Sequence, residues 1–349
     1  MVREKNYNVQ LNSKVAIFTW HGAQVQINGP TQFCYVSEDT PMVFYVNLHE
    51  ALEQIRKKNS SQGLRGPRIM ICGPPDSGKS TLSRILCNYA SRLGRKLIYV
   101  DLDCRNNSLG LSNTIGAIQI AKPVSVEHEF MEELGSPPPL VYFTGDSRKT
   151  RELIFDSLLR RVIDDINMKF ENCAETNYGG MVVNTSGCQT PEDFQEIEAI
   201  AKIFEIDVCA ILGSERVLNQ LTQKFKLSSL NLRNIMVPKS GGVISKTIQE
   251  KTDLIDLKSH QYFYGINSEW IPYNFEVKMN DVNIYRITCN FLIIIIVAQT
   301  YWVISRVESQ KIASQSDSAL MSDAVIDFTT FTYFYVRLFT IIIAKLTVL

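Results

Sequence analysis

Nine residues from Gly73 to Thr81, reading GPPDSGKST, have the types and spacing of a phosphate-binding loop. They match G-x-x-x-x-G-K-[ST] at every fixed position and follow an apolar run, RIMIC. Glycines at Gly73 and Gly78 let successive backbone N–H groups turn toward one centre, where a helix beginning near Lys79 aims its positive dipole end. The segment therefore predicts a nucleotide site, with a ligand-free glycine turn as the alternative.

Each side chain of the loop has an expected task in binding ATP. Lys79 reaches the β- and γ-phosphates as a point charge, Ser80 supplies a hydroxyl to Mg²⁺, and Thr81 bonds the α-phosphate. These three residues make ATP and Mg²⁺ the expected cofactors.

Two acids end the next apolar run, LIYVDLD, at Asp101 and Asp103. Because the carboxyl ends of parallel strands meet at one edge of a sheet, we expect both carboxylates near Lys79 and the metal. Either acid could hold Mg²⁺ through water or accept the proton of an attacking hydroxyl, and spacing alone does not separate these roles. Two solvated acids at a strand end are the alternative.

Apolar runs alternate with amphipathic helical patterns after Arg68. This order is typical of an α/β fold, with a P-loop NTPase-type parallel sheet that has helices on both faces. The predicted strands are residues 68–73, 96–103, 140–145, 179–185, 208–213 and 234–238, and the predicted helices are 79–94, 151–171 and 193–205.

The flanking regions differ in pattern from this central part. Short alternating runs over residues 14–48 predict a small antiparallel β-domain before it, and residues 47–59 predict a helix. We expect an apparently incomplete β-domain at 1–50, a helix and linker at 51–66, a kinase-like domain at 67–275 and a divergent, apolar region at 276–349. The tail Phe328–Leu349 is just long enough to cross a membrane, but Arg337 would be costly in the middle of the span and the Thr and aromatic content fits β-structure equally well, so membrane insertion is the weaker interpretation.

Composition excludes some classes of protein. Lys+Arg and Asp+Glu both number 36, so no global positive field would draw the chain to nucleic acid or to an anionic membrane. A hydrophobic content of 45% excludes disorder over the whole length. The 8 cysteines include no CxxC pair, and we expect Cys72 and Cys87 to be buried free thiols of an intracellular protein.

Several segments together resemble one family, the Clp-type polynucleotide 5′-hydroxyl kinases of pre-mRNA cleavage and polyadenylation, which also associate with tRNA splicing endonuclease in animals. The segments are FTWHG (18–22), PPDSGKST (74–81), NYASRLGRKLIYVDLD (88–103), NTIGA (113–117), PKSGGV (238–243) and YFYG (262–265), within a resemblance that runs from about Lys14 to Arg286. It implies transfer of the ATP γ-phosphate to a 5′-hydroxyl RNA end, a nuclear location and partners in the cleavage complex. It also implies that ATP lies between the N-terminal and central domains, with contacts from Asp76, Ser77, Gly78 and the following loop residues, and from Lys14.

The chain departs from this family on the RNA side. Arg105-Asn106-Asn107 replaces a G-Q-G, SRKTR (147–151) replaces a clasp over the RNA end, and Cys188 replaces a base-stacking tryptophan. The lid after PKSGG has no arginine, only Lys246, Lys251 and Lys258. Lysine lacks the planar fork that grips phosphate oxygens.

The substrate-side candidates are therefore Lys246, Lys251 and Arg148. Besides the kinase, two further functions stay open from the sequence: a catalytically inactive, ATP-bound scaffold, and a P-loop NTPase with a membrane-attached tail.

Overall fold

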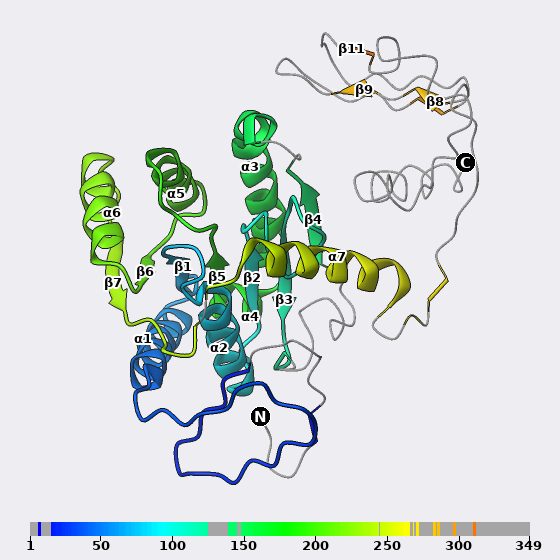
Figure 1. The fold of residues 1–349 in the computed structure, drawn as a ribbon. Coiled ribbons are helices and arrows are strands. Elements are labelled where there is room, and N and C mark those ends of the chain that lie inside the picture. Colours follow the sequence, from blue (N-terminus) through cyan, green and yellow to red (C-terminus); the bar gives the residue numbers. More distant parts are fainter. Residues whose placement is uncertain are drawn as a thin grey trace, which may run out of the picture. The chain divides into compact units, whose positions relative to one another are not determined.

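The computed structural model of the chain describes residues 6–7, 15–124, 139–144, 148–243, 245–265, 268 and 270–271, together with four two-residue strands after residue 281. The chain forms two compact units. The larger comprises Met1–Phe143 and Asp156–Thr247, and the smaller comprises Thr144–Phe155 and Ile248–Leu349. The larger unit holds the phosphate loop and is drawn in blue to green in Figure 1. The domain boundaries predicted at residues 50, 66 and 275 stay predictions.

A seven-stranded sheet forms the centre of the larger unit, in the order β4-β3-β2-β5-β1-β6-β7. The strands are β1 Arg68–Cys72, β2 Leu97–Asp101, β3 Thr114–Ile120, β4 Leu140–Phe143, β5 Met181–Asn184, β6 Val208–Leu212 and β7 Arg233–Val237. The five strands β2, β5, β1, β6 and β7 run parallel, as predicted.

The sheet is mixed, because β3 is antiparallel to β2 and β4 is antiparallel to β3. The sequence did not predict β3, and it placed the strand at residues 140–145 in the parallel set. No helix lies between β2 and β3, and because parallel neighbours are usually joined by a crossover helix, strands connected without one favour antiparallel pairing. These strands extend one edge and leave the parallel centre unchanged.

Helices cover both faces of the sheet, as predicted. They are α1 Met42–Ser61, α2 Lys79–Arg92, α3 Arg148–Asn172, α4 Ala174–Gly179, α5 Pro191–Ile203 and α6 Glu215–Leu227. Leu52 of α1 and Leu86 of α2 pack in one buried cluster with Ile69 and Ile71 of β1. Met70, which points to the opposite face, is also fully buried, and Figure 1 shows α3, α5 and α6 on that side.

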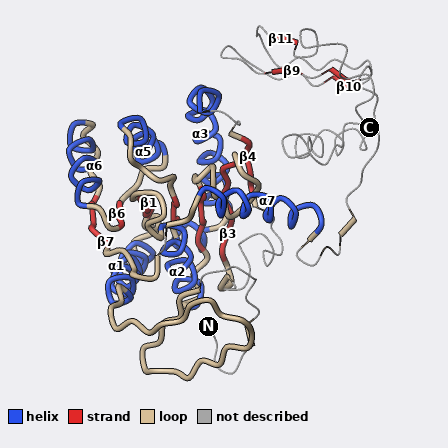
Figure 2. Tube along the Cα trace, in the orientation of Figure 1, coloured by secondary structure: helices blue, strands red, loops and turns tan. Residues whose placement is uncertain are grey.

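The segment before α1 has no regular strand over residues 15–41, and Figure 2 shows it as loop. The strand predicted from MVFYVNL is wrong, because these residues begin α1. Tyr45, Leu48 and Leu52 are the buried residues that decide this, since they recur every three to four positions, the period of a helix face. The helix predicted at 47–59 is confirmed and is longer than expected.

The smaller unit contains α7 Ile248–Tyr264 and two short antiparallel pairs, β8 Val282–Asn283 with β10 Ile296–Val297, and β9 Tyr285–Arg286 with β11 Gln310–Lys311. Within the part of the chain that the structure describes, none of the helices has the length and apolar content needed to cross a bilayer. The apolar tail Phe328–Leu349 lies outside the described residues.

Candidate nucleotide and divalent-cation site

The phosphate loop joins the carboxyl end of β1 to the first residue of α2. Gly73 has φ +151 and Gly78 has φ +97, both in the region that favours glycine. A Cβ on Gly73 would lie 2.9 Å from the carbonyl oxygen of Leu212, so the backbone there has no room for a side chain. Gly78 is also the N-cap of α2, and no side chain caps its N–H groups, which leaves the helix N-terminus open to an anion.

Lys79 begins α2 and is buried, with an exposure of only 6%. Its Nζ donates a hydrogen bond of 2.9 Å to the carbonyl oxygen of Pro74 in the same loop. Burial lowers the pKa of the Lys79 ammonium, while the nearby Asp103 carboxylate opposes that shift. A buried ammonium in an anion-binding loop is suited to hold a phosphate.

Asp101 ends β2 and is fully buried. Its Oδ2 accepts from Tyr99 Oη at 3.0 Å and from Ser108 N and Oγ at 2.9 and 2.5 Å. Its Oδ1 accepts from Asp103 N at 3.1 Å and from Asn184 Nδ2 at 3.0 Å. Burial and the neighbouring Asp103 raise the pKa of Asp101, and the hydrogen bonds from Ser108 and Asn184 oppose that shift. This carboxylate therefore has donors on both oxygens and organises the loop after β2.

Asp103 lies beyond the strand end and is 8% exposed. Its Oδ1 accepts from the backbone N–H groups of Arg105 at 3.2 Å and Asn106 at 3.4 Å, and its Oδ2 accepts from Asn106 Nδ2 at 3.4 Å. Among the charged groups near Lys79, the Asp103 carboxylate does most to oppose the lowering of the Lys79 pKa by burial. Of the two acids that the sequence left equivalent, Asp103 is thus the one beside the loop lysine.

Ser80 occupies the second position of α2 and is half-buried. Its Oγ accepts a hydrogen bond of 3.2 Å from Asn184 Nδ2. Asn184 is the last residue of β5, which lies between β1 and β2, and it is the register partner of Asp101. Sequence reasoning missed Asn184, although a polar residue ending an apolar parallel strand beside the loop was an available signal.

The lid, the segment after PKSGG, contacts the phosphate loop through the backbone of Lys246. Asp76 has φ +52, and its Oδ2 accepts from the backbone N of Lys246 at 3.4 Å, so the start of the lid lies against the loop. Ser77 is buried and Thr81 is exposed on the first turn of α2. The side chain of Lys246 is exposed.

For three of the predicted site residues, the described part of the chain shows no contact with the phosphate loop. Lys14 lies outside the described residues. Arg148 begins α3, but its side chain is not among those described, and Lys251 belongs to α7 of the smaller unit. Their roles stay predictions.

Cys188, which the resemblance implies replaces a base-stacking tryptophan, is buried against the phosphate loop. Its backbone N donates to the carbonyl oxygen of Gly73 at 3.1 Å, and its Sγ lies 3.4 Å from the same oxygen. Burial raises the pKa of this thiol to about 12. A side chain in this position supports the loop and offers no face on which a base could stack.

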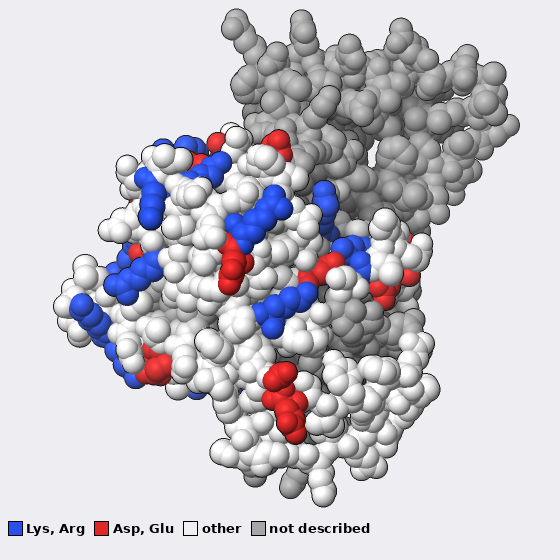
Figure 3. Space-filling model, turned by 60° about the vertical axis from the view of Figure 1, so that its left-hand side comes forward, with Lys and Arg blue, Asp and Glu red and all other residues white. Residues whose placement is uncertain are grey.

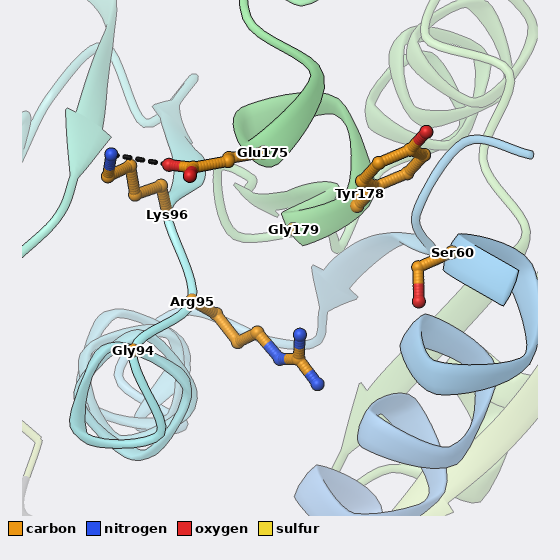
Figure 4. Close-up of a pocket in the computed structure, with 7 residues that line it drawn as sticks. All are labelled: Ser60, Gly94, Arg95, Lys96, Glu175, Tyr178 and Gly179. Carbon is orange, nitrogen blue, oxygen red and sulfur yellow. Dashed lines mark hydrogen bonds and ion pairs between the residues drawn. The ribbon is translucent and has the colours of Figure 1, made fainter. Parts of the chain in front are cut away.

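A pocket of about 230 Å³ lies away from this site, at the amino ends of β2 and β5. Figure 4 shows its lining, in which Lys96 points toward Glu175, with Nζ and Oε2 2.5 Å apart. Arg95 donates from Nε to Glu53 Oε1 at 2.9 Å. Since both cations have carboxylate partners, this pocket lacks a free charge for a phosphate and is not the nucleotide site.

Comparison with known families decides the assignment. A family model described as the P-loop of the mRNA cleavage and polyadenylation factor CLP1 matches residues 73–265, which is more than half of the chain. The chain belongs to the Clp1 family. A second model, the N-terminal beta-sandwich domain of polyadenylation factor, matches residues 1–59, in agreement with the type of domain predicted there, although the described residues 15–41 form no regular strand. The predicted family and fold class are both confirmed.

Individual relatives agree with this assignment. The human polyribonucleotide 5′-hydroxyl-kinase Clp1 is 38% identical over 288 residues, which is 82% of this chain and 66% of the relative. The CLP1 homolog of Aedes aegypti is 35% identical over 288 residues, with the same shares. The chain spans just under two thirds of the length of these curated relatives.

Two solved structures share the fold. The Clp1p–Pcf11p complex aligns with a TM-score of 0.61 at 23% identity, over 70% of this chain and 59% of that chain. A structure that describes an extended Pcf11p–Clp1p interface and ATP loss in a point mutant aligns with a TM-score of 0.61 at 22% identity, over 70% and 60%.

Proposed function

We propose that this chain binds ATP with Mg²⁺ and transfers the γ-phosphate to the 5′-hydroxyl end of RNA, as a Clp1-family protein of pre-mRNA 3′-end processing. The observation that supports this most is the geometry of the loop, in which the buried Lys79 begins α2 at the carboxyl end of β1 and the N-terminus of α2, uncapped by any side chain, is open to phosphate. Phosphoryl transfer depends mainly on positioning the reacting groups and on neutralising the charge of the transferring phosphate. A phosphate-binding loop with a buried lysine can do both.

The burial and the contacts of Lys79, Asp101 and Asp103 suggest a separate role for each residue. Lys79 neutralises charge on the β- and γ-phosphates, and the backbone N–H groups of residues 76–81 surround them. Asp103 accepts the proton of the attacking hydroxyl or orients the metal. Asp101, whose oxygens already accept five hydrogen bonds, holds the loop that presents Asp103.

The residues at the loop fit a magnesium nucleotide. Mg²⁺ usually binds through one or two carboxylates together with substrate phosphates and water, rather than in a cage made only by protein. Among the described residues, no group of three or more His, Cys, Asp or Glu side chains could hold a metal ion. Ser80 and Asp103 would hold the ion, which would neutralise charge on the transferring phosphate.

A single-turnover assay tests the proposal directly. Purified protein is mixed with γ-labelled ATP and a 5′-hydroxyl oligoribonucleotide, and labelled RNA is measured. Transfer that depends on Mg²⁺ and is lost in Lys79→Ala supports the kinase. ATP binding without transfer contradicts it.

The scaffold is a second candidate, because the RNA-side groups are altered. Cys188 is 1% exposed and supports the loop, and the lid of residues 238–265 contains no arginine. Loss of an arginine that stabilises the transition state costs ~10³–10⁵ in rate. In this case ATP would stabilise the folded chain by mass action, and the transfer assay separates the two functions.

Partners and location form a further part of the proposal. Clp1p is known in complex with Pcf11p, and we propose a comparable cleavage-complex subunit as a partner of this chain in the nucleus. RNA contact would come from a local group of cations, since net charge is zero and the face in Figure 3 shows basic side chains interspersed with acidic ones. Affinity purification of the tagged chain from nuclear and cytoplasmic fractions tests both points.

A further inference from the structure

Asn184 connects Ser80, a residue of the candidate metal site, to the buried carboxylate of Asp101 through one amide nitrogen. Its Nδ2 lies 3.2 Å from Ser80 Oγ and 3.0 Å from Asp101 Oδ1. Asn184 is fully buried, and its register partners are Ile71 on β1 and Asp101 on β2. It therefore lies at the centre of the three strands whose carboxyl ends carry the site.

The chemistry of the neighbours fixes the orientation of this amide. The Asp101 carboxylate accepts hydrogen bonds from four other donors and has none to give, so the amide nitrogen of Asn184, rather than its oxygen, must face it. The same nitrogen donates to Ser80 Oγ, which uses one lone pair of that oxygen and leaves the second lone pair for another ligand.

The amide oxygen of Asn184, in contrast to the amide nitrogen, has no hydrogen-bond partner among the described residues. Asn184 Oδ1 is buried and accepts no hydrogen bond from any described residue. The three residues before it on β5, Met181 to Val183, are apolar and fully buried, and an apolar side chain of similar size at position 184 would avoid an unpaired acceptor. Asn184 is thus unfavourable for the stability of the core. Its amide nitrogen, however, supplies the hydrogen-bond donor that Ser80 and Asp101 share.

We propose that Asn184 is a positioning residue of the divalent-cation site, which fixes Ser80 Oγ against the anchored carboxylate of Asp101. The hydroxyl oxygen is then held in one orientation, with a lone pair available to the cation that accompanies the nucleotide. The inference rests on the proposed function only in assuming a magnesium nucleotide at this loop. Asn184 acts through Ser80 and does not itself contact the nucleotide.

Asn234 provides a matched control. It lies on β7, on the other side of β1, and its Nδ2 also donates to a hydroxyl, Thr222 Oγ1 at 3.0 Å. Its Oδ1 is likewise buried without a donor among the described residues. Removing either amide breaks a hydrogen bond to a hydroxyl, but Asn234 is only half-buried and has no second acceptor in the described part of the chain, whereas Asn184 is fully buried, also donates to Asp101 and adjoins the phosphate loop.

The test measures the affinity of the protein for a fluorescent ATP analogue, once with Mg²⁺ and once with EDTA. The proteins compared are the wild type, the single variants Asn184→Ala, Asn234→Ala and Ser80→Ala, and the double variant Ser80→Ala/Asn184→Ala. We expect Asn184→Ala to weaken the Mg²⁺-dependent affinity by about tenfold or more, the range seen for residues that orient metal ligands, with little change in EDTA. Asn234→Ala should match wild type in both buffers. The double variant should bind no more weakly than Ser80→Ala alone, because both substitutions remove one interaction.

Three results of the binding measurements would overturn the proposal. They are an unchanged Mg²⁺-dependence in Asn184→Ala, an equal loss of affinity in Mg²⁺ and in EDTA, and additive losses in the double variant. If Asn184→Ala does not fold, Asn184→Ser, which keeps one donor, replaces it. Failure of both to fold while Asn234→Ala folds would make Asn184 purely structural. A wild type that binds Mg²⁺–ATP but transfers no phosphate would contradict the kinase and leave this inference intact.

Discussion

The ammonium of Lys79 donates a 2.9 Å hydrogen bond to the carbonyl oxygen of Pro74, five residues earlier in the chain. The cation of the phosphate loop is thus held by the loop's own backbone, in a buried position where its pKa is lowered. A bound triphosphate would offer this ammonium a charged acceptor in place of a neutral one, and charge-assisted hydrogen bonds are the stronger kind.

Replacing Lys79 by alanine should weaken ATP binding by about tenfold to a hundredfold, since a hydrogen bond to a charged group contributes ~1.5–3 kcal/mol. Because phosphate requires the protonated amine, wild-type affinity should also fall as pH rises through the lowered pKa, before a solvated lysine would titrate at 10.5. Calorimetric titration between about pH 7 and about pH 10 measures both effects. Lys57→Ala, at an exposed position of α1, is the control, and an equal loss there would contradict the assignment.

Gly73→Ala should destabilise the fold by ~1–3 kcal/mol through backbone strain and should weaken ATP binding, because a Cβ would meet the Leu212 carbonyl oxygen at 2.9 Å. Gly94 has φ +76 but open space around it, so Gly94→Ala should cost only ~1–2 kcal/mol and leave ATP binding unchanged. Urea unfolding and nucleotide titration report the two quantities. Normal ATP affinity in Gly73→Ala would show that the tight turn is not needed.

Asp101→Asn should lower the free energy of unfolding at neutral pH by ~1–3 kcal/mol, since an amide nitrogen would face donors that now bond a carboxylate oxygen. The folded pKa of Asp101 is raised above 3.8, so the folded state binds more protons between 3.8 and that raised value. The Asp101 contribution to wild-type stability is therefore present below pH 3.8 and is lost as pH rises through the folded pKa. Urea unfolding over this range should show that this decline is absent from Asp101→Asn, and an unchanged pH profile would contradict the interpretation.

Asp103→Asn should act on transfer rather than on stability. If Asp103 is the base, the transfer rate falls by ~10²–10⁴ while the Mg²⁺–ATP affinity is unchanged. If it orients the metal, the Mg²⁺ concentration needed for binding rises as well. The single-turnover assay, repeated across Mg²⁺ concentrations, separates these roles, and wild-type transfer in Asp103→Asn would exclude both.

The cysteines should react in the order set by their surroundings. Burial raises the pKa of Cys87 and Cys188 to about 12, so both thiols stay protonated and covered. A hydrogen bond of 3.1 Å from Thr176 Oγ1 lowers the pKa of the partly exposed Cys173. Peptide mapping after brief iodoacetamide treatment of the folded protein should find Cys173 modified well before Cys87 and Cys188. Early labelling of Cys188 would show that the loop opens readily.

The sequence by itself determined the phosphate loop, the parallel centre of the sheet and the family. These depend on local patterns: glycines at fixed spacing, apolar runs of strand length, and a lysine and serine at the start of a helix. Each signal is contained in fewer than about twenty consecutive residues and needs no knowledge of distant contacts.

Only the tertiary structure separated Asp101 from Asp103 and brought Asn184 to Ser80. The two acids are alike in sequence, and they differ because one lies inside a hydrogen-bonded strand end while the other lies beside Lys79. Asn184 is 104 residues from Ser80 along the chain and reaches it because β5 inserts between β1 and β2. Strand order is set by how whole helices and strands pack against one another, so no local pattern could have predicted that contact.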